Sequence, residues 1–230
     1  MRGRPSPTAQ RVRLRTPEQV FSAREGRRDG DRVVPLGPKA RRTRAAIMAA
    51  AAEVLAVKGY QRTTMADVAD AADVSLGTVY QYFHDRADVV AGLVRSLLLQ
   101  QRAEADVAWR VPEGRAGLLR VLRGFITPYV EHPALARVWE EVTYVDDDLA
   151  ELRRALGRVF TDSVERELER AEAAGEIRPG LEVPRTAIAL TGMVDRYCLV
   201  TYVLDPRDDP PSVEESAEVL ADLWLTAIAR

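Results

Sequence analysis

The stretch of sequence that decides the fold is residues 63–83, TTMADVADAADVSLGTVYQYF. Thr64 with Asp67 three residues later forms a capping-box pattern, and Ser75 is a second residue of a type favoured at an N-cap. The stretch therefore predicts two short helices joined by a turn of three or four residues. Such helices cross steeply, so a small residue must lie where they touch, and Ala69 is in that position.

The other residues of this stretch fit the same packing. The positions that must face inward are apolar or partly apolar, namely Val68, Ala72, Val74, Val79 and Tyr82. Asp73 occupies the turn, where glycine is usual, and aspartate tolerates a left-handed backbone better than most residues. The pattern indicates a helix-turn-helix.

The outward residues of the second helix suit contact with duplex DNA. Its first turn is the end that enters a major groove, where hydroxyls and amides meet phosphates or base edges. The tyrosines and the glutamine that follow can reach phosphate oxygens or adenine, and the threonines before the first helix lie beside free helix amides. The candidate DNA contacts are Thr63, Thr64, Ser75, Leu76, Gly77, Thr78, Tyr80, Gln81 and Tyr82. The alternative is a helical hairpin inside a core, with the tyrosines simply packed.

The rest of the chain is predicted to be all-α, with about nine helices. No segment shows the period-2 alternation of a half-buried strand, and Gly and Pro residues punctuate alanine- and leucine-rich stretches. A helix over 39–58 should end at Gly59 in a left-handed C′ conformation. Further helices are predicted near 86–108, 114–130, 133–145, 148–174, 184–204 and 213–229. The domains follow as a flexible basic extension (1–38), a DNA-binding domain (39–84) and a larger helical domain (85–230).

Composition narrows the class of protein. Of 230 residues, 47% are hydrophobic and 30% charged, as in soluble globular proteins, and a single cysteine excludes an intramolecular disulfide. Residues 1–102 carry 18 Lys and Arg against 10 Asp and Glu, whereas residues 103–230 carry 15 against 25. A basic amino-terminal half suits nucleic acid. The start lacks an apolar run typical of a secretory signal, so we expect a cytoplasmic protein with no membrane partner.

Six short segments carry a resemblance to a known family. Gly59-Tyr60, Thr63-Thr64, Val68-Ala69, Ala72-Asp73-Val74-Ser75, Gly77-Thr78-Val79-Tyr80 and Tyr82-Phe83 resemble the amino-terminal domain of the tetracycline-repressor (TetR) family. The resemblance is specific over residues 40–100. It implies a three-helix DNA-binding domain, a fourth helix acting as a lever, and a basic DNA contact where that helix opens. Arg86 is the matching residue, although its setting, Asp85-Arg86-Ala87-Asp88, departs from the family's usual Lys-Glu-Glu.

The resemblance also implies a homodimer. The last two helices of the family, here 184–204 and 213–229, usually form a bundle between two subunits. The stripe on the last one comprises Val213, Ala217, Leu220, Ala221, Trp224 and Ile228, and the preceding helix offers Ile188, Thr191, Gly192, Asp195 and Leu199. Burial inside one subunit explains much of the same pattern.

A small-molecule effector is the third implication. Its pocket would lie among the helices of the carboxy-terminal domain, and effector binding would release a repressor from its double-stranded DNA operator. The candidate linings are Trp109, Phe125, Tyr129, Trp139, Tyr144, Phe160, Met193 and Tyr197. Most aromatic residues at helical spacing are only core residues. No cofactor is expected.

Arg2-Gly3-Arg4-Pro5 resembles the core of an AT-hook, an extended arm with arginines in a narrow A·T minor groove. Such grooves have an enhanced negative potential that attracts arginine, so Arg2 and Arg4 are further candidate DNA contacts. A disordered start with no fixed partner is the alternative.

An enzyme and an architectural DNA-binding protein are the two alternative classes of protein. An enzyme is disfavoured because His84 and His132 have no metal-ligand spacing, Cys198 lies in an apolar stretch, and no glycine-rich phosphate loop occurs. No catalytic or metal site is therefore expected. An architectural DNA-binding protein without an effector is the other alternative. A carboxy-terminal domain of this size argues against it, because dimerisation alone needs less.

Overall fold

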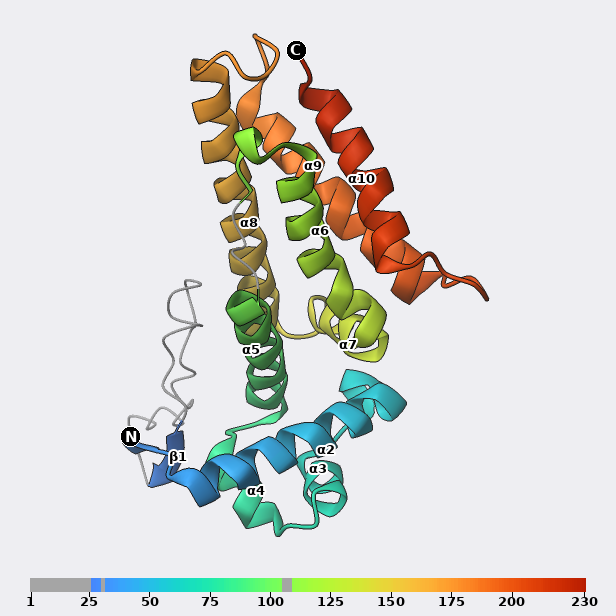
Figure 1. The fold of residues 1–230 in the computed structure, drawn as a ribbon. Helices are drawn as coiled ribbons and strands as arrows, with labels where there is room; N and C mark the ends of the chain where they lie inside the picture. The colour runs from blue at the N-terminus through green and yellow to red at the C-terminus, as the bar shows by residue number, and fades with distance from the viewer. Residues whose placement is uncertain (1–25, 30–31, 105–108) are drawn as a thin grey trace, which may run out of the picture.

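The computed structural model describes residues 26–29, 32–104 and 109–230, with side chains for 36–96 and 109–230. Over these residues the chain forms nine α-helices (Figure 1). They are α2 (Pro38–Arg62), α3 (Met65–Ala71), α4 (Leu76–Tyr82), α5 (Arg86–Glu104), α6 (Gly114–Glu131), α7 (Pro133–Val142), α8 (Asp147–Ala173), α9 (Val183–Leu199) and α10 (Val213–Ile228). Helices α2–α4 lie at one end, and the long helices α6, α8, α9 and α10 extend away from them. The predicted all-α fold is confirmed.

The local signals of the first three helices work as the sequence predicts. Pro38 occupies the first turn of α2, where its missing N–H costs nothing. Gly59 has φ +72° and breaks the regular part of α2 at the predicted place. Thr64 and Asp67 form a complete capping box at α3, and the hydroxyl of Ser75 accepts from the Thr78 amide at the start of α4.

The turn between α3 and α4 is held in a left-handed conformation. Asp73 has φ +52° and is the only non-glycine residue with positive φ in the part of the chain that the structure describes. The amide of Asp73 donates to the Asp70 carbonyl, and the amide of Val74 donates to the Ala69 carbonyl. The predicted turn is therefore confirmed, and the aspartate carries the strain of a position that favours glycine.

The core of the DNA-binding domain extends beyond that domain. Ala69 and Val79 are buried at the crossing of α3 and α4, as predicted, and Ala72, Val74 and Tyr82 pack against the same cluster. The cluster also contains Val138 and Val142 of α7 and the first apolar residues of α8, Leu149 and Leu152. The boundary predicted at residues 84/85 thus divides the sequence but not the core.

A second core fills the carboxy-terminal domain, between α6, α8, α9 and α10. It corrects the interpretation of α10. The residues expected to face a second subunit are buried inside one protomer instead: Ala217, Leu220, Ala221, Trp224 and Ile228 are at most 3% exposed. On α9, Leu199 is likewise buried, whereas Ile188 is 61% exposed. Periodicity gives the apolar face of a helix but not what covers it.

The predicted extension, 1–38, contains regular structure. Strands β1 (Gly26–Asp29) and β2 (Arg32–Pro35) pair antiparallel, with Arg28 opposite Val33, and β1 lies against α4. This strand pair corrects the prediction of a flexible segment for residues 26–29 and 32–35. The strands are four residues each, too short for the period-2 pattern to be visible in the sequence.

Among the described residues, one helical segment is long and apolar enough to cross a membrane, by length and composition only. The segment Val183–Leu204 combines α9 with a short π-helical turn, η2 (Val200–Leu204), and its most apolar 18 residues have a mean hydropathy of 1.3. Nearly half of these residues, 44%, are buried in the protein core. A core helix of a globular domain meets the same criteria of length and composition.

The strained turn predicts opposite effects of two substitutions. Asp73→Gly should raise the free energy of unfolding by up to about 1 kcal/mol, because glycine adopts positive φ without steric cost. Asp73→Ala should lower it by about 1 kcal/mol. Urea unfolding followed by circular dichroism measures both changes, with Asp70→Ala on the exposed side of α3 as the control. Equal effects of the glycine and alanine variants would contradict the strain argument.

Candidate functional site

Helix α4 has one face fixed in the core and one face open to solvent. Val79 and the C-cap residue Phe83 are at most 1% exposed, so their burial fixes the rotation of the helix about its own axis. On the other face Leu76 is 42% exposed and Tyr80 47% exposed, and Gln81 is also exposed. A rigid helix that presents apolar, phenolic and amide groups outward has the properties of a groove-reading helix.

The first turn of α4 is preorganised by its own hydroxyls. The Ser75 hydroxyl accepts from the Thr78 amide at 3.1 Å and lies 2.8 Å from the Thr78 hydroxyl. A Cβ at Gly77 would meet only the Ser75 hydroxyl, at 3.8 Å, so the space outside this turn is open. Another backbone can therefore approach Gly77 closely.

The start of α3 is tied to the end of α2. The Asp67 carboxylate accepts from the Thr64 amide at 2.9 Å and from the Lys58 ammonium at 2.7 Å, and the Thr64 hydroxyl accepts from the Asp67 amide. The hydrogen bond from Lys58, followed by those from Thr64, holds the pKa of Asp67 down at about 2, against its usual 3.8. The exposed Thr64 is thereby fixed at the edge of the candidate DNA face.

Two predicted DNA contacts have other roles. Thr63 is 2% exposed and its hydroxyl donates to the Gly59 carbonyl at 2.7 Å, so its side chain does not face solvent. The Arg86 guanidinium donates to the carbonyls of Gln61 and Thr63 and stacks over the Tyr60 ring. Both predictions are corrected for the same reason: backbone carbonyls of Gly59, Gln61 and Thr63 accept from these donors. Tyr82 is only partly exposed and packs against the core.

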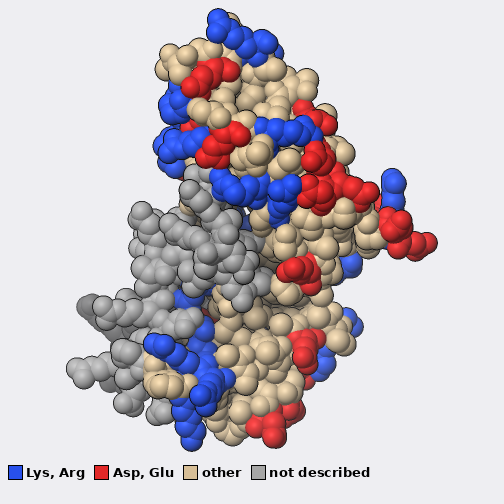
Figure 2. Space-filling view, viewed as in Figure 1, with Lys and Arg blue, Asp and Glu red and all other residues tan. Residues whose placement is uncertain are grey.

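Positive charge gathers beside α4. Lys39, Arg41 and Arg42 are exposed in the first turns of α2, and Figure 2 shows Lys and Arg atoms grouped at that end of the molecule. A basic surface of this kind lowers the free energy of binding to phosphates. Arg2 and Arg4 lie outside the described residues.

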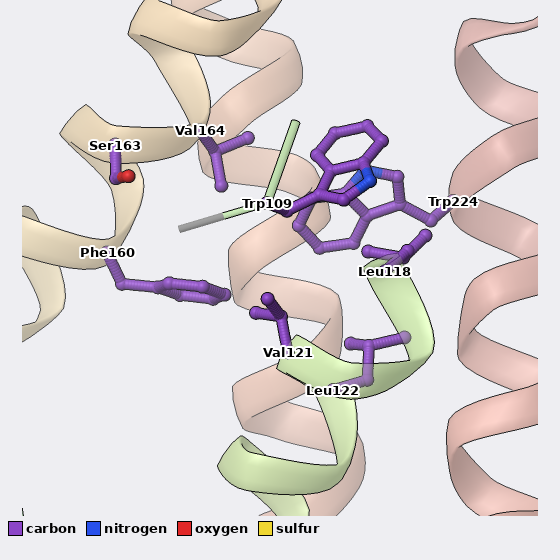
Figure 3. A pocket seen from close by; sticks show the side chains of 8 residues that line it. All are labelled: Trp109, Leu118, Val121, Leu122, Phe160, Ser163, Val164 and Trp224. Atoms are coloured by element: carbon purple, nitrogen blue, oxygen red, sulfur yellow. The ribbon is translucent and has the colours of Figure 1, made fainter. Parts of the chain in front are cut away.

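The carboxy-terminal domain contains a small cavity of about 10 Å³, roughly the space of one water molecule. Its lining is drawn in Figure 3 and comprises Trp109, Leu118, Val121, Leu122, Phe160, Ser163, Val164 and Trp224. The indoles of Trp109 and Trp224 meet edge to face at 5.9 Å. Phe160 continues into a stack, with Phe125 at 5.3 Å and Tyr129 at 5.8 Å from Phe125.

The predicted effector residues thus separate into three groups. Trp109 and Phe160 line the cavity, and Phe125 and Tyr129 extend it as the stack. Met193 and Tyr197 pack against the same core. Trp139 packs against the other core, and Tyr144 is 79% exposed with its hydroxyl donating to Glu140. The last two residues therefore lie away from the cavity: Trp139 of α7 packs against the core of the DNA-binding domain, and Tyr144 follows α7 at the surface.

Sequence reasoning missed most of the cavity lining. Leu118, Val121 and Leu122 lie on the apolar stripe of α6, and Val164 lies on that of α8, so they look like any core residue. Trp224 belongs to the stripe predicted to face a second subunit, yet it is 1% exposed and its indole N–H is buried without a partner in the described structure. Only the three-dimensional arrangement identifies these residues.

Two observations concern a metal site and the single cysteine. They contain no group of three or more His, Cys, Asp or Glu side chains placed to hold a metal ion. Burial, together with the nearby Asp195 carboxylate, raises the pKa of Cys198 to about 12. The thiol is therefore protonated at neutral pH and packs as a small apolar group.

Comparison with known proteins agrees with this geometry. The sequence profile described as "Bacterial regulatory proteins, tetR family" matches residues 47–93, from the middle of α2 into α5. The HTH-type transcriptional regulator TtgR of Pseudomonas putida is 28% identical over 188 residues, which covers 74% of this chain and 87% of that protein. Residues 47–93 thus match the DNA-binding part of the TetR family, and the chain is similar to transcriptional regulators over about three quarters of its length (74%).

Solved structures show the same TetR fold. The fatty acid degradation regulator FadR of Bacillus halodurans has a TM-score of 0.61 at 20% identity, covering 84% of this chain and 97% of its own. The ketosteroid transcriptional regulator KstR2 of Mycobacterium tuberculosis has a TM-score of 0.59 at 18% identity, covering 81% and 95%. The helical carboxy-terminal domain is therefore part of the shared architecture.

The capping carboxylate predicts a pH-dependent contribution to stability. Because the pKa of Asp67 is lowered in the folded chain, its contribution is complete above about pH 4 and is lost as the pH falls towards 2. Asp67→Asn should therefore melt at a lower temperature than the wild type at pH 7, with the gap narrowing below pH 4. Thermal melts at pH 7, 5, 4 and 3 measure the gap, with Asp70→Asn as the control. A gap that stays constant down to pH 3 would contradict this assignment.

Proposed function

We propose that this chain is a ligand-responsive repressor that reads its operator with the exposed face of α4. The observation that carries the proposal is the contrast within α4: Val79 is fully buried, whereas Leu76, Tyr80 and Gln81 face solvent. Within the part of the chain that the structure describes, Tyr80 and Gln81 make no side-chain hydrogen bond or ion pair, although β1 lies against α4. Thr64, Ser75, Gly77 and Thr78 complete the proposed DNA face at its edge.

The basic surface supports the same partner. Lys39, Arg41 and Arg42 extend the positive end of the molecule beside α4 and suit the phosphates that flank a major groove. An arm carrying Arg2 and Arg4 would add a minor-groove contact. A regulator of this kind works on chromosomal DNA, so we also propose a cytoplasmic location.

The effector part of the proposal rests on the cavity. Its apolar and aromatic lining is the kind that binds small molecules, but 10 Å³ is far below the roughly 300–1,000 Å³ of occupied pockets. An effector must therefore displace side chains such as Phe160 to enter. A ligand that requires an expanded domain binds that state better, which is the condition for shifting the population.

A dimer would place two reading heads on one operator, as TetR-type regulators generally do. We propose that the second copy covers the exposed apolar side chains of the last two helices, which are Ile188, Val219 and Leu223. Ala189 and Gly192 are exposed beside Ile188, and a Cβ at Gly192 would meet nothing within 4 Å. A partner helix can approach α9 closely there.

The reading face predicts graded losses of operator affinity. Footprinting on the DNA upstream of its own coding sequence, with and without candidate ligands, locates the operator. Tyr80→Phe should then weaken binding about tenfold, as expected for one hydrogen bond to a charged phosphate, and Gln81→Ala should relax the preference at one base pair.

The control is Tyr144→Phe, a matched loss of an exposed phenolic hydroxyl outside α4. Protection that shows no sequence preference, or an equal loss in the control, would refute the reading face. Ligands that never alter the footprint would instead favour the alternative function, an effector-independent architectural DNA-binding protein.

The dimer face predicts a change of oligomeric state. Leu223→Arg should raise the dimer dissociation constant at least thirtyfold, because a buried hot-spot residue contributes about 2 kcal/mol or more. Sedimentation velocity over a concentration series measures it. Val57→Arg in α2, at an 81% exposed position, is the matched control and should remain dimeric. A Leu223→Arg variant that sediments like the wild type at every concentration would exclude this face.

A further inference from the structure

The turn that follows Gly59 is held by a carboxylate from another part of the chain. Gly59 leaves the helical conformation, so the amides of Tyr60 and Gln61 point away from the α2 hydrogen-bond ladder. Both donate to Glu141 on α7: the Tyr60 nitrogen lies 2.9 Å from Oε2 and the Gln61 nitrogen 3.1 Å from Oε1. Charge-assisted bonds of this kind are about twice as strong as neutral ones.

The same turn is held from its opposite side by α5. The Arg86 guanidinium donates to the carbonyls of Gln61 and Thr63 at 2.9 Å each and lies 3.9 Å from the centre of the Tyr60 ring. Helix α7 thus binds the amides of the turn with a negative group, and α5 binds its carbonyls with a positive group. We call residues 60–63 the clamped turn.

Glycine is required at residue 59 for two reasons. Its φ of +72° disfavours any other residue, and a Cβ would lie 3.2 Å from Oε2 of Glu141. The carboxylate therefore approaches the backbone more closely than a side chain at this position would comfortably allow. The Tyr60 side chain adds a further bond, because its hydroxyl donates to Asp146 at 3.2 Å just before α8.

Contacts continue from α7 towards the effector cavity. Glu140, the neighbour of Glu141, pairs with Arg153 of α8 at 2.9 Å, and Arg153 lies 3.7 Å from Asp195 of α9. The Tyr129 hydroxyl donates to Asp195 at 3.0 Å, and its ring belongs to the aromatic stack that ends at Phe160 in the cavity wall. The clamped turn and the cavity are therefore joined by consecutive direct contacts.

Apolar packing alone does not fix the orientation of the reading head. Val138 and Val142 of α7 pack into the core of the DNA-binding domain, but such packing is non-directional. The two bonds from Glu141 have defined geometry, so they select one register between α2 and α7.

We propose that Glu141 is a positioning residue for DNA binding: it fixes the orientation of the helix-turn-helix, and a shift of α7 reaches the reading head through its carboxylate. The second half of this statement rests on the proposed effector response. The first half does not, and it can be tested on the free protein.

The direct test measures the distance between the two domains within one protomer. Spin labels at Val57→Cys in α2 and Val159→Cys in α8 occupy exposed positions, while the native Cys198 is fully buried and stays unlabelled. Dilution with excess unlabelled chain isolates the distance within a protomer. Glu141→Ala should broaden the distance distribution measured by double electron–electron resonance. Glu141→Gln should give an intermediate width, because one amide oxygen replaces two carboxylate oxygens.

The matched control is Glu131→Ala, which removes an equal charge from an exposed position at the end of α6. Its distance distribution should equal that of the labelled parent. Circular dichroism confirms that each variant is folded before its distances are compared, and Glu141→Gln serves if the alanine variant does not fold. Unchanged distributions in folded Glu141 variants, or equal broadening in Glu131→Ala, would overturn the proposal.

Operator titration gives a second readout. Glu141→Ala should weaken operator binding about tenfold, while the dependence of the logarithm of affinity on that of salt concentration keeps its wild-type slope, because no phosphate contact is lost. A reduced slope would mean that Glu141 acts by another route and would overturn a positioning role. A wild-type chain that binds no operator would refute the proposed function, while the distance measurement would still decide the role of Glu141.

Discussion

Two backbone amides impose the constraint on which the arrangement of the domains depends. Once Gly59 turns the chain out of α2, the N–H groups of Tyr60 and Gln61 lose their helical partners. The Tyr60 amide is partly buried, so leaving it without an acceptor would cost about as much as a lost hydrogen bond, whereas the Gln61 amide is exposed. Glu141 is that acceptor, and α7 must therefore lie against the end of α2. The neighbouring Val138 and Val142 then become part of the core of the DNA-binding domain.

Helix α8 connects this core with the second one. Leu149 and Leu152, near its start, belong to the DNA-binding core, whereas Val164 and Leu168 belong to the core of the carboxy-terminal domain. A continuous helix has little bending freedom over such a span, because each residue is held in the hydrogen-bond ladder. The two cores are consequently not independent, although the sequence motif that defines the family ends within α5.

The sequence predicted well those features that depend on neighbours in the chain. Gly59, Thr64 and Asp73 act on residues within a few positions, so their residue types alone were informative. Features that depend on distant partners were missed. Nothing near Arg86 indicates that it would bind the carbonyls of a turn 25 residues away, and the stripe containing Trp224 has the same period whether it faces its own core or a second subunit. The β1–β2 hairpin was missed because its strands are too short to show a period.

The small volume of the cavity determines how an effector could act on this junction. A ligand can shift a conformational equilibrium only by its difference in affinity between the two states. Because the cavity has only about 10 Å³, almost all of a ligand's contacts would exist only in the expanded state. The difference in ligand affinity between the two states would therefore be large. Phe160 in the cavity wall and Arg153, which holds Glu140, lie on α8 about two turns apart. Displacing Phe160 would therefore act on the helix that carries Arg153. Arg153 pairs with Glu140, the neighbour of Glu141, whose carboxylate holds the clamped turn.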